Sequence, residues 1–183
     1  MDLALTLYLI GLAGAAVAAY FIFASFAFGA GYQPTPRRIV DRLLRLAELR
    51  PTDTLYDLGA GTGSIVFRAA RVYRARVIGV EIEPIRLLIL RLRRALFAER
   101  ERVTIRWGNF FRVDFHDASV VAVFLWPGAM ERLRTKFEQE LPPGARVVSY
   151  FHSIQGWTPE YVDRDEKIYL YVRAGKPVQI PAA

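Results

Sequence analysis

The stretch Thr54-Leu55-Tyr56-Asp57-Leu58-Gly59-Ala60-Gly61-Thr62-Gly63 decides the fold of this chain. A short apolar run ends there in an acid, which is followed by three glycines at alternate positions. Glu81 lies eighteen residues beyond Gly63, at the end of a second apolar run, Val77–Val80. A strand, a glycine-rich turn, a helix and a second strand that ends in an acid make a site for an adenosine-containing cofactor. The alternative is that the glycines only make a tight turn, but the positions of Asp57 and Glu81 would then be a coincidence.

Strands alternate with helices along the chain, which predicts an α/β protein with a Rossmann-like, mostly parallel sheet covered on both faces. Only about fifteen residues separate Phe151 from the last apolar run. That gap is tight for a crossover helix, so we expect the last strand to join the sheet in the antiparallel direction. The predicted strands are 54–58, 76–82, 102–107, 119–125, 145–151 and 166–173, and the predicted helices are 39–49, 64–74, 84–100 and 128–140.

The N-terminal segment is apolar, and no charged residue occurs between Leu3 and Pro36. Its densest part, Leu3–Phe28, exceeds the roughly 20 residues that a helix needs to cross about 30 Å of hydrocarbon. A signal peptide would begin with basic residues and have a shorter apolar core, and a helix buried in a domain core would be shorter. The sequence therefore predicts one transmembrane helix in residues 1–30, a domain carrying the cofactor site in 31–176, and a poorly ordered tail in 177–183.

Basic residues follow the apolar segment, and none precedes it. By the positive-inside rule, this asymmetry predicts that everything after the helix lies in the cytoplasm. The whole chain carries a net charge of +7. On a membrane-tethered domain, this excess first suggests attraction to anionic lipid headgroups. Nucleic-acid binding is the second interpretation, and no basic and aromatic motif supports it. The basic residues that follow the helix are Arg37, Arg38, Arg42, Arg45 and Arg50.

Cysteine is absent, and the chain has only two histidines, His116 and His152. Disulfides and thiolate-bound metals are therefore excluded, and a histidine-based metal site is not expected. No general base can be named from the sequence, and we interpret His152 as a structural side chain.

Three details distinguish S-adenosylmethionine from NAD as the cofactor. The glycines follow an acid in the pattern G-x-G-x-G, and a carboxylate at Asp57 suits a methionine ammonium and a sulfonium but would repel a pyrophosphate. Asn109 and Phe110 follow the third predicted strand, where an amide and an aromatic ring can pair with and stack on adenine. The domain is also short, which leaves little room for a nicotinamide half. These details favour S-adenosylmethionine.

The residues of this site resemble those of the class I S-adenosylmethionine-dependent methyltransferases. Among them, the chain is similar to the archaeal protein-lysine methyltransferases and to the related membrane-anchored lysine methyltransferases of mitochondria. The resemblance covers about residues 32–173. Most class I methyltransferases share the glycine motif, so it indicates the cofactor but not the substrate. The stretches that carry the resemblance are Tyr32–Pro36, Tyr56–Gly63, Gly108–Phe111, Pro143–Ser149 and Gly156–Pro159.

The resemblance implies a role for each part of the cofactor site. Asp57 and the first two glycines would line the methionine end, Glu81 would hold the ribose, and Asn109 with Phe110 would hold the adenine. The predicted cofactor-binding residues are Asp57, Gly59, Ala60, Gly61, Gly63, Glu81, Ile82, Asn109 and Phe110.

The methyl acceptor is expected at the end of the fourth strand, where the chain reads Phe124-Leu125-Trp126-Pro127. Enzymes that methylate amide-like nitrogens typically have Asn-Pro-Pro-Tyr there, so its absence counts against methylation of adenine or glutamine. The leading hypothesis is a protein-lysine N-methyltransferase with an aromatic slot for the lysine. The candidates for this substrate pocket are Tyr32, Thr35, Phe124 and Trp126, and ordinary packing at strand ends is the alternative for each.

One rival function depends on the segment Ile85–Phe97, which carries apolar residues on more than one side, between arginines. Such a helix is either fully buried or contacts a membrane. Membrane contact would favour methylation of a lipid or quinone-like small molecule. The other rival is a non-catalytic membrane protein that binds S-adenosylmethionine. We expect the core face of this helix to hold Ile85, Leu88, Ile89, Leu92 and Leu96, with Leu87, Leu90 and Phe97 elsewhere.

Overall fold

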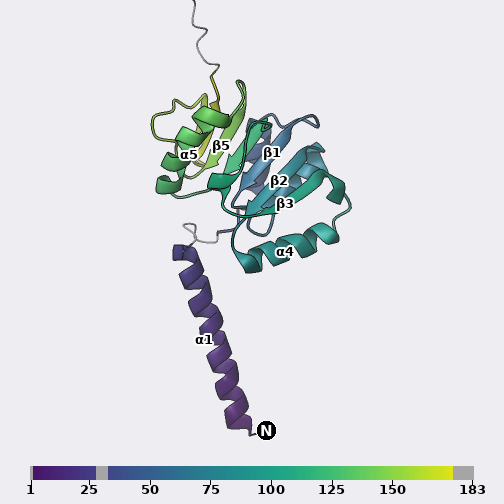
Figure 1. The fold of residues 1–183 in the computed structure, drawn as a ribbon, viewed down its shortest axis with the longest axis vertical. Helices are drawn as coiled ribbons and strands as arrows, with labels where there is room; N and C mark the ends of the chain where they lie inside the picture. Colours follow the sequence, from purple (N-terminus) through teal and green to yellow (C-terminus); the bar gives the residue numbers. More distant parts are fainter. Residues whose placement is uncertain (1, 28–32, 175–183) are drawn as a thin grey trace, which may run out of the picture. The chain divides into compact units, whose positions relative to one another are not determined.

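The computed structural model describes residues 2–27 and 33–174, with the backbone alone for residue 18 and residues 21–27. The chain divides into two compact units, Met1–Gln33 and Pro34–Ala183. The first unit is a single helix, α1 (Leu3–Ala27), which contains no charged residue (Figure 1). Within the part of the chain that the structure describes, no helix combines the length and the apolarity needed to cross a membrane. The assignment of a transmembrane helix therefore stays a prediction.

The second unit is built on a seven-stranded sheet with the order β3-β2-β1-β4-β5-β7-β6. Strands β1 to β5 are parallel, and β7 pairs with β5 in the antiparallel direction. The predicted mostly parallel sheet with an antiparallel C-terminal strand is thus confirmed. The strands are β1 (Thr54–Leu58), β2 (Arg76–Glu81), β3 (Val103–Trp107), β4 (Val120–Val123), β5 (Arg146–Tyr150), β6 (Tyr161–Asp163) and β7 (Ile168–Val172).

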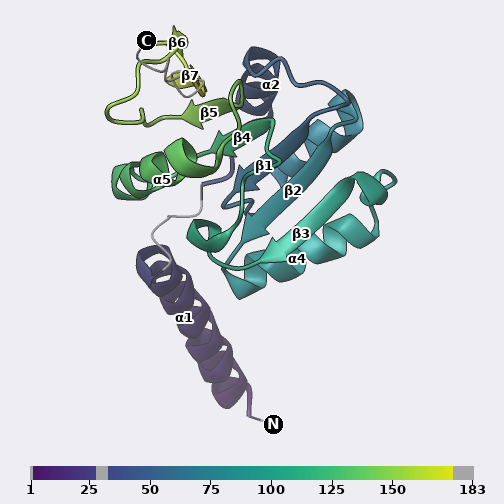
Figure 2. The ribbon, with the colours of Figure 1, turned by 45° about the horizontal axis from the view of Figure 1, so that its top comes forward.

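Helices cover both faces of the sheet: α2, α3 and α4 lie on one face and α5 lies on the other (Figures 1 and 2). The predicted helix 64–74 becomes α3 followed by a π-helical turn, and the predicted helix 84–100 ends at Ala95. The helices are α2 (Arg37–Leu46), α3 (Ser64–Arg68), the π-helical turn Ala69–Tyr73, α4 (Pro84–Ala95), α5 (Pro127–Glu140) and the 3-10 turns Arg100–Arg102 and Phe110–Arg112.

The strands supply both hydrophobic layers, because successive residues of a strand point to opposite faces of the sheet. Leu55 and Ala122 are fully buried in the layer that contains the apolar sides of α2, α3 and α4. Tyr56 points to the opposite face, where its ring meets the edge of Phe115 at a centroid distance of 5.5 Å. Phe115 in turn packs against Phe137 of α5. The sheet is therefore buried on both sides, as a parallel sheet requires.

The side of α4 that faces the sheet is not the side that we expected. Leu87 and Leu90 are buried, whereas Leu88 and Leu92 are each 57% exposed. Both apolar stripes have helical spacing, so periodicity alone cannot choose between them. The start of the helix decides the choice. Glu83 caps α4 by accepting hydrogen bonds from two of its amides, and its buried carboxylate also holds the guanidinium of Arg86, which brings Leu87 and Leu90 inward with it. The exposed side comprises Ile85, Leu88, Ile89, Leu92 and Leu96, and Phe97 is buried.

Ion pairs connect the beginning of the domain to its end. The Nε atom of Arg42 in α2 donates to Asp163 of β6 at 3.0 Å, across 121 residues of sequence. Arg38, one turn earlier in α2, pairs with Glu166 in the turn between β6 and β7. Strand β6 was not predicted from the sequence. The short hairpin that contains it is held against α2 by these pairs.

Candidate active site

The candidate site lies where the order of the strands reverses. Strand β1 is flanked by β2 on one side and by β4 on the other. In open α/β sheets, ligands bind outside the carboxyl ends of the strands at such a reversal. The glycine turn leaves β1 there and is tied to β2, because the amides of Gly59 and Ala60 both donate to the carbonyl of Val80, at 3.0 and 2.9 Å.

The glycine turn has a backbone that other residues rarely adopt. Gly59, Gly61 and Gly63 have φ angles of +79°, +56° and +91°. A Cβ atom at Gly63 would lie 2.5 Å from the ring of Phe67 and 2.6 Å from Leu90. No side chain fits there without displacing the core, and Gly63 then starts α3 as its N-cap. The turn therefore brings backbone close to whatever occupies the site.

Glu81 is buried at the end of β2 and organises the amides around it. One carboxylate oxygen accepts the Gly61 amide at 2.7 Å. The other accepts the amides of Ile82 and Glu83 at 3.0 and 2.9 Å. These bonds hold the acid, the glycine turn and the start of α4 in one arrangement. Six of the predicted cofactor-binding residues meet here, namely Asp57, Gly59, Ala60, Gly61, Glu81 and Ile82.

Asp57 lies in β1 beside this turn and is only 4% exposed. Burial, and after it the negative charge of Glu81, raises the pKa of its carboxyl to about 7. Within the described residues, no hydrogen bond to the Asp57 carboxyl is found that would offset the loss of water. Glu81 already has the Arg86 guanidinium at 4.0 Å, so a bound cation would chiefly stabilise the carboxylate of Asp57.

Asn109 and Phe110 follow β3 and lie at the same end of the sheet. The preceding turn is fixed to β2, because the Gly108 amide donates to the carbonyl of Glu81 at 3.0 Å and the Trp107 indole donates to that of Ile82 at 3.2 Å. The Asn109 side-chain oxygen accepts the Phe111 amide at 3.0 Å and so caps a 3-10 turn. This oxygen belongs to the amide that we expect to pair with adenine, and it already accepts one backbone hydrogen bond.

The aromatic residues predicted for the substrate pocket separate in the structure. Phe124 is half-buried, and its ring lies 4.6 Å from that of Tyr150 and 6.5 Å from that of Phe151. Trp126 is 61% exposed at the start of α5. Tyr32 lies outside the described residues. Tyr150 and Phe151 were not predicted from the sequence. Tyr150 ends β5 and Phe151 follows it, just as Phe124 follows β4, and this shared position at strand ends could have identified them.

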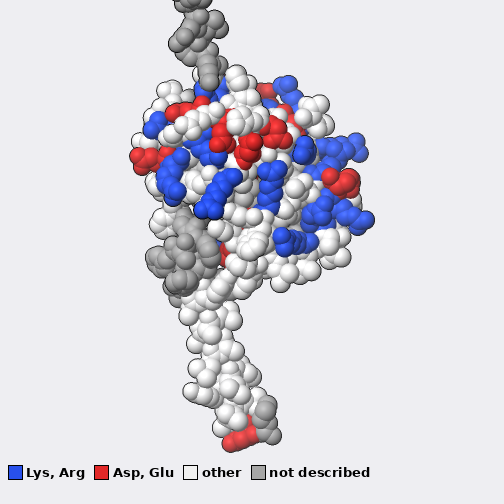
Figure 3. Space-filling view, in the orientation of Figure 1, with Lys and Arg blue, Asp and Glu red and all other residues white. Residues whose placement is uncertain are grey.

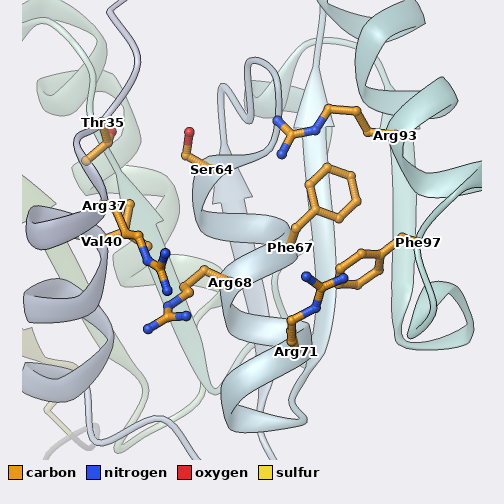
Figure 4. A pocket seen from close by; sticks show the side chains of 9 residues that line it. All are labelled: Thr35, Arg37, Val40, Ser64, Phe67, Arg68, Arg71, Arg93 and Phe97. Atoms are coloured by element: carbon orange, nitrogen blue, oxygen red, sulfur yellow. The ribbon is translucent and has the colours of Figure 1, made fainter.

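Thr35, the fourth residue predicted for the substrate pocket, lies in a separate cleft. It lines a cleft of about 330 Å³ between α2, α3 and α4, which contains none of the predicted cofactor-binding or aromatic residues (Figure 4). Four arginines line this cleft, one each from α2, α3, the π-helical turn and α4. Its lining residues are Thr35, Arg37, Val40, Ser64, Phe67, Arg68, Arg71, Arg93 and Phe97.

The two histidines lie in different environments. The ring of His152 lies 5.0 Å from that of Phe151, with the planes steeply inclined. His116 comes within 4.8 Å of carboxylate oxygens of Asp114 and Glu140. Glu140 already pairs with Lys136 and accepts the amide of Phe115. Neither arrangement assigns a base or a metal.

The fold, the glycine turn and the paired acids at the strand reversal define an S-adenosylmethionine-dependent methyltransferase. A solved structure of an RNA methyltransferase from Salinibacter ruber, in complex with S-adenosylhomocysteine, supports this class. It is 35% identical, matches with a TM-score of 0.76, and covers 82% of this chain and 100% of its own. The chain belongs to the ANTKMT methyltransferase domain family, whose model matches residues 57–161.

Curated relatives agree with this membership. The chain is 41% identical to a protein-lysine N-methyltransferase of Saccharolobus islandicus, over 77% of this chain and 92% of that protein. It is 30% identical to the mouse adenine nucleotide translocase lysine N-methyltransferase, over 76% of this chain and 62% of that protein. The first of these relatives therefore matches over nearly its whole length.

Proposed function

We propose that this protein is a protein-lysine N-methyltransferase. The observation that carries the proposal is the 41% identity to an archaeal protein-lysine N-methyltransferase over 92% of that protein. The arrangement of aromatic residues at the ends of β4 and β5 agrees with it. Phe124, Tyr150 and Phe151 form a cluster where a lysine chain can be held between apolar rings.

In this proposal the buried acids bind the cofactor. Asp57 faces the methionine ammonium, because its carboxylate lies buried beside the glycine turn and needs a cation. Glu81 holds the ribose hydroxyls with the lone pairs that the backbone amides leave free. Phe110 supports the adenine, with Ile82 on the side of β2. Asn109 presents its amide NH₂ group, since its oxygen is shared with the Phe111 amide.

The reaction is a direct displacement. The neutral lysine nitrogen attacks the methyl carbon, the carbon–sulfur bond breaks, S-adenosylhomocysteine leaves, and the lysine proton passes to water. A free lysine with a pKa of about 10.4 must lose its proton first, which costs about 4 kcal/mol at pH 7.4. Desolvation between aromatic rings lowers that pKa, and alignment of the two reacting atoms lowers the barrier further.

We also propose that α1 anchors the protein in a membrane as a single span, with the methyltransferase domain in the cytoplasm. The 25 uncharged residues of α1 and the arginines that follow it support this arrangement. A reporter protein fused after Ala183 tests the orientation. A reporter found on the opposite side of the membrane would overturn it.

Transfer of a labelled methyl group tests the reaction. The purified full chain is incubated with methyl-labelled S-adenosylmethionine, membranes and total RNA, and the label is then counted in the protein, lipid and RNA fractions. We expect label on lysine, identified by mass spectrometry, and none with Asp57→Ala. Label in lipid alone, as the rival small-molecule reaction predicts, would sink the lysine proposal, and so would label in RNA alone. Cofactor binding without any transfer would favour the non-catalytic alternative.

A further inference from the structure

The side of α4 that faces away from the sheet carries a second apolar surface. We call it the outer stripe, and it consists of Ile85, Leu88, Ile89, Leu92 and Leu96, which are 39% to 91% exposed. At about 100° per residue, these five positions fall within an arc of roughly 100° and extend for about 17 Å along the helix. In the described part of the chain, all five count as exposed, although Ile85 and Ile89 are partly covered. Contiguous exposed apolar residues of this kind mark a surface that contacts a partner or a membrane.

Arginines border the outer stripe on both sides, and α4 contains no acidic residue. Arg91 is exposed on one side, where no ion pair or hydrogen bond is found among the described residues. Arg93 lies on the other side, donates to the backbone carbonyl of Thr62, and stacks over the ring of Phe67 at 4.8 Å. None of the contacts found for Arg91 or Arg93 involves a carboxylate. The helix thus has the composition of an interfacial helix, with an apolar face between basic flanks.

The cleft lined by four arginines opens next to the outer stripe, and Arg93 belongs to the border of both (Figure 4). Arg68 pairs with Asp41 and Arg71 pairs with Glu99, whereas Arg37 and Arg93 have no carboxylate partner in the described residues. The cleft therefore keeps an excess of positive charge. Figure 3 looks onto the side of the domain that carries α5, where basic side chains are numerous with acidic ones among them. Because α2, α3 and α4 cover the same face of the sheet, the cleft and the stripe open on one side.

We infer that this face docks the domain onto a bilayer that contains anionic phospholipid. The outer stripe would enter the boundary between headgroups and acyl chains, and the arginine cleft would receive a lipid phosphate. The arginines that flank the outer stripe on α4, which contains no acidic residue, would be attracted to an anionic lipid surface. The connection to α1 also supports this choice. Only ten residues lead from Ala27 to Arg37, which lines the cleft, so the chain between them spans at most about 36 Å. The inference extends the anchoring proposed above and is independent of the molecule that is methylated.

The absence of cysteine from the chain allows lipid contact to be measured directly. A single cysteine is introduced by Leu92→Cys, on the stripe, and labelled with an environment-sensitive fluorophore. The matched control is Val162→Cys on β6, the opposite edge of the sheet, where the native side chain is 36% exposed. The full chain is reconstituted in vesicles of phosphatidylcholine with phosphatidylglycerol and with lipids that carry a quencher. Circular dichroism confirms that both labelled chains are folded.

We expect quenching by lipid at position 92, none at position 162, and weaker quenching in vesicles of phosphatidylcholine alone. Arg37→Gln and Arg91→Gln should each shift the equilibrium between docked and undocked domain about fivefold toward the undocked form. A label at position 92 that stays as exposed to water as the control would overturn the inference. A label there that is shielded but not quenched by lipid would also overturn it, because α1 or a second copy would then cover the stripe. Methyl transfer is not read, so failure of the lysine proposal does not affect this result.

Discussion

Replacement of Asp57 by asparagine should stabilise the domain at alkaline pH while it removes affinity for S-adenosylmethionine. The Asp57 side chain is 4% exposed, and its pKa is raised to about 7, first by burial and then by the charge of Glu81. The ionised form of Asp57 is thus destabilised in the folded protein, and a bound cation would stabilise it. Asparagine has nearly the same shape and cannot ionise.

The magnitude follows from the difference between the two pKa values. The ordinary pKa of this carboxyl is 3.8 and the folded value is about 7. Because the folded pKa lies above the unfolded one, only the folded state binds the proton between these two pH values. The contribution of Asp57 to the free energy of unfolding is therefore fully present below pH 3.8 and is lost as the pH rises through 7. About three pKa units at 1.36 kcal/mol each give about 4 kcal/mol. The variant escapes this loss, which corresponds to a rise in Tm on the order of 10 °C at pH 8.

Unfolding in urea, followed by circular dichroism from pH 4.5 to 8.5, measures this effect on the native chain and on the variant in the same mild detergent. The stability gained by the variant should grow with pH and level off above pH 7. Calorimetry at pH 8 should show that the variant binds S-adenosylmethionine at least about 30-fold more weakly, since one partner of a buried charge pair is gone. A gain in the free energy of unfolding that is independent of pH would refute the claim that ionised Asp57 destabilises the fold. An unchanged affinity for S-adenosylmethionine would refute its role as the partner of the cation.

Three further outcomes are expected. The affinity of the native chain for S-adenosylmethionine should fall about tenfold per pH unit below pH 7, because the cation binds the ionised form of Asp57, and a flat titration would contradict this. Gly63→Ala should lower the free energy of unfolding by about 3 kcal/mol through overpacking and its positive φ, whereas Gly128→Ala, which has open space around it, should leave that free energy nearly unchanged. Leu90→Ala should cost about 3 kcal/mol and Leu92→Ala less than about 0.5, and the reverse order in urea unfolding would show that α4 is turned the other way.

Much of the fold follows from the sequence because the strands of a buried parallel sheet are continuous apolar runs. The predicted strand 54–58 coincides with β1 residue for residue. The sequence pattern does not predict elements whose structure depends on contacts with distant residues. The three residues of β6 are exposed or only half-buried, and they form a strand because β7 pairs with them. The rotation of α4 depends on a cap and an ion pair at Glu83, which helical periodicity does not contain.

The candidate site divides in the same way. Asp57 and Glu81 could be found from sequence because a fixed spacing joins them to the glycine turn, and the structure brings them together. Thr35 was expected among the aromatic residues near the acceptor, yet it lies in the cleft beside α2. A residue in a connecting segment has no periodic pattern from which its position could be read. The capping bond of the Asn109 oxygen likewise depends on the local turn.

The ion pairs between α2 and the C-terminal hairpin have a consequence for biosynthesis. Arg42 finds Asp163 only after another 121 residues have been made, so α2 cannot reach its final contacts until nearly the whole chain has left the ribosome. Contacts of such long range form late and slow the folding of a domain. Under the proposed anchoring, α1 would already be in the membrane by then. The domain would therefore finish folding at the bilayer surface, and a chain that stops before Asp163 would leave α2 without its ion-pair partners in the C-terminal hairpin.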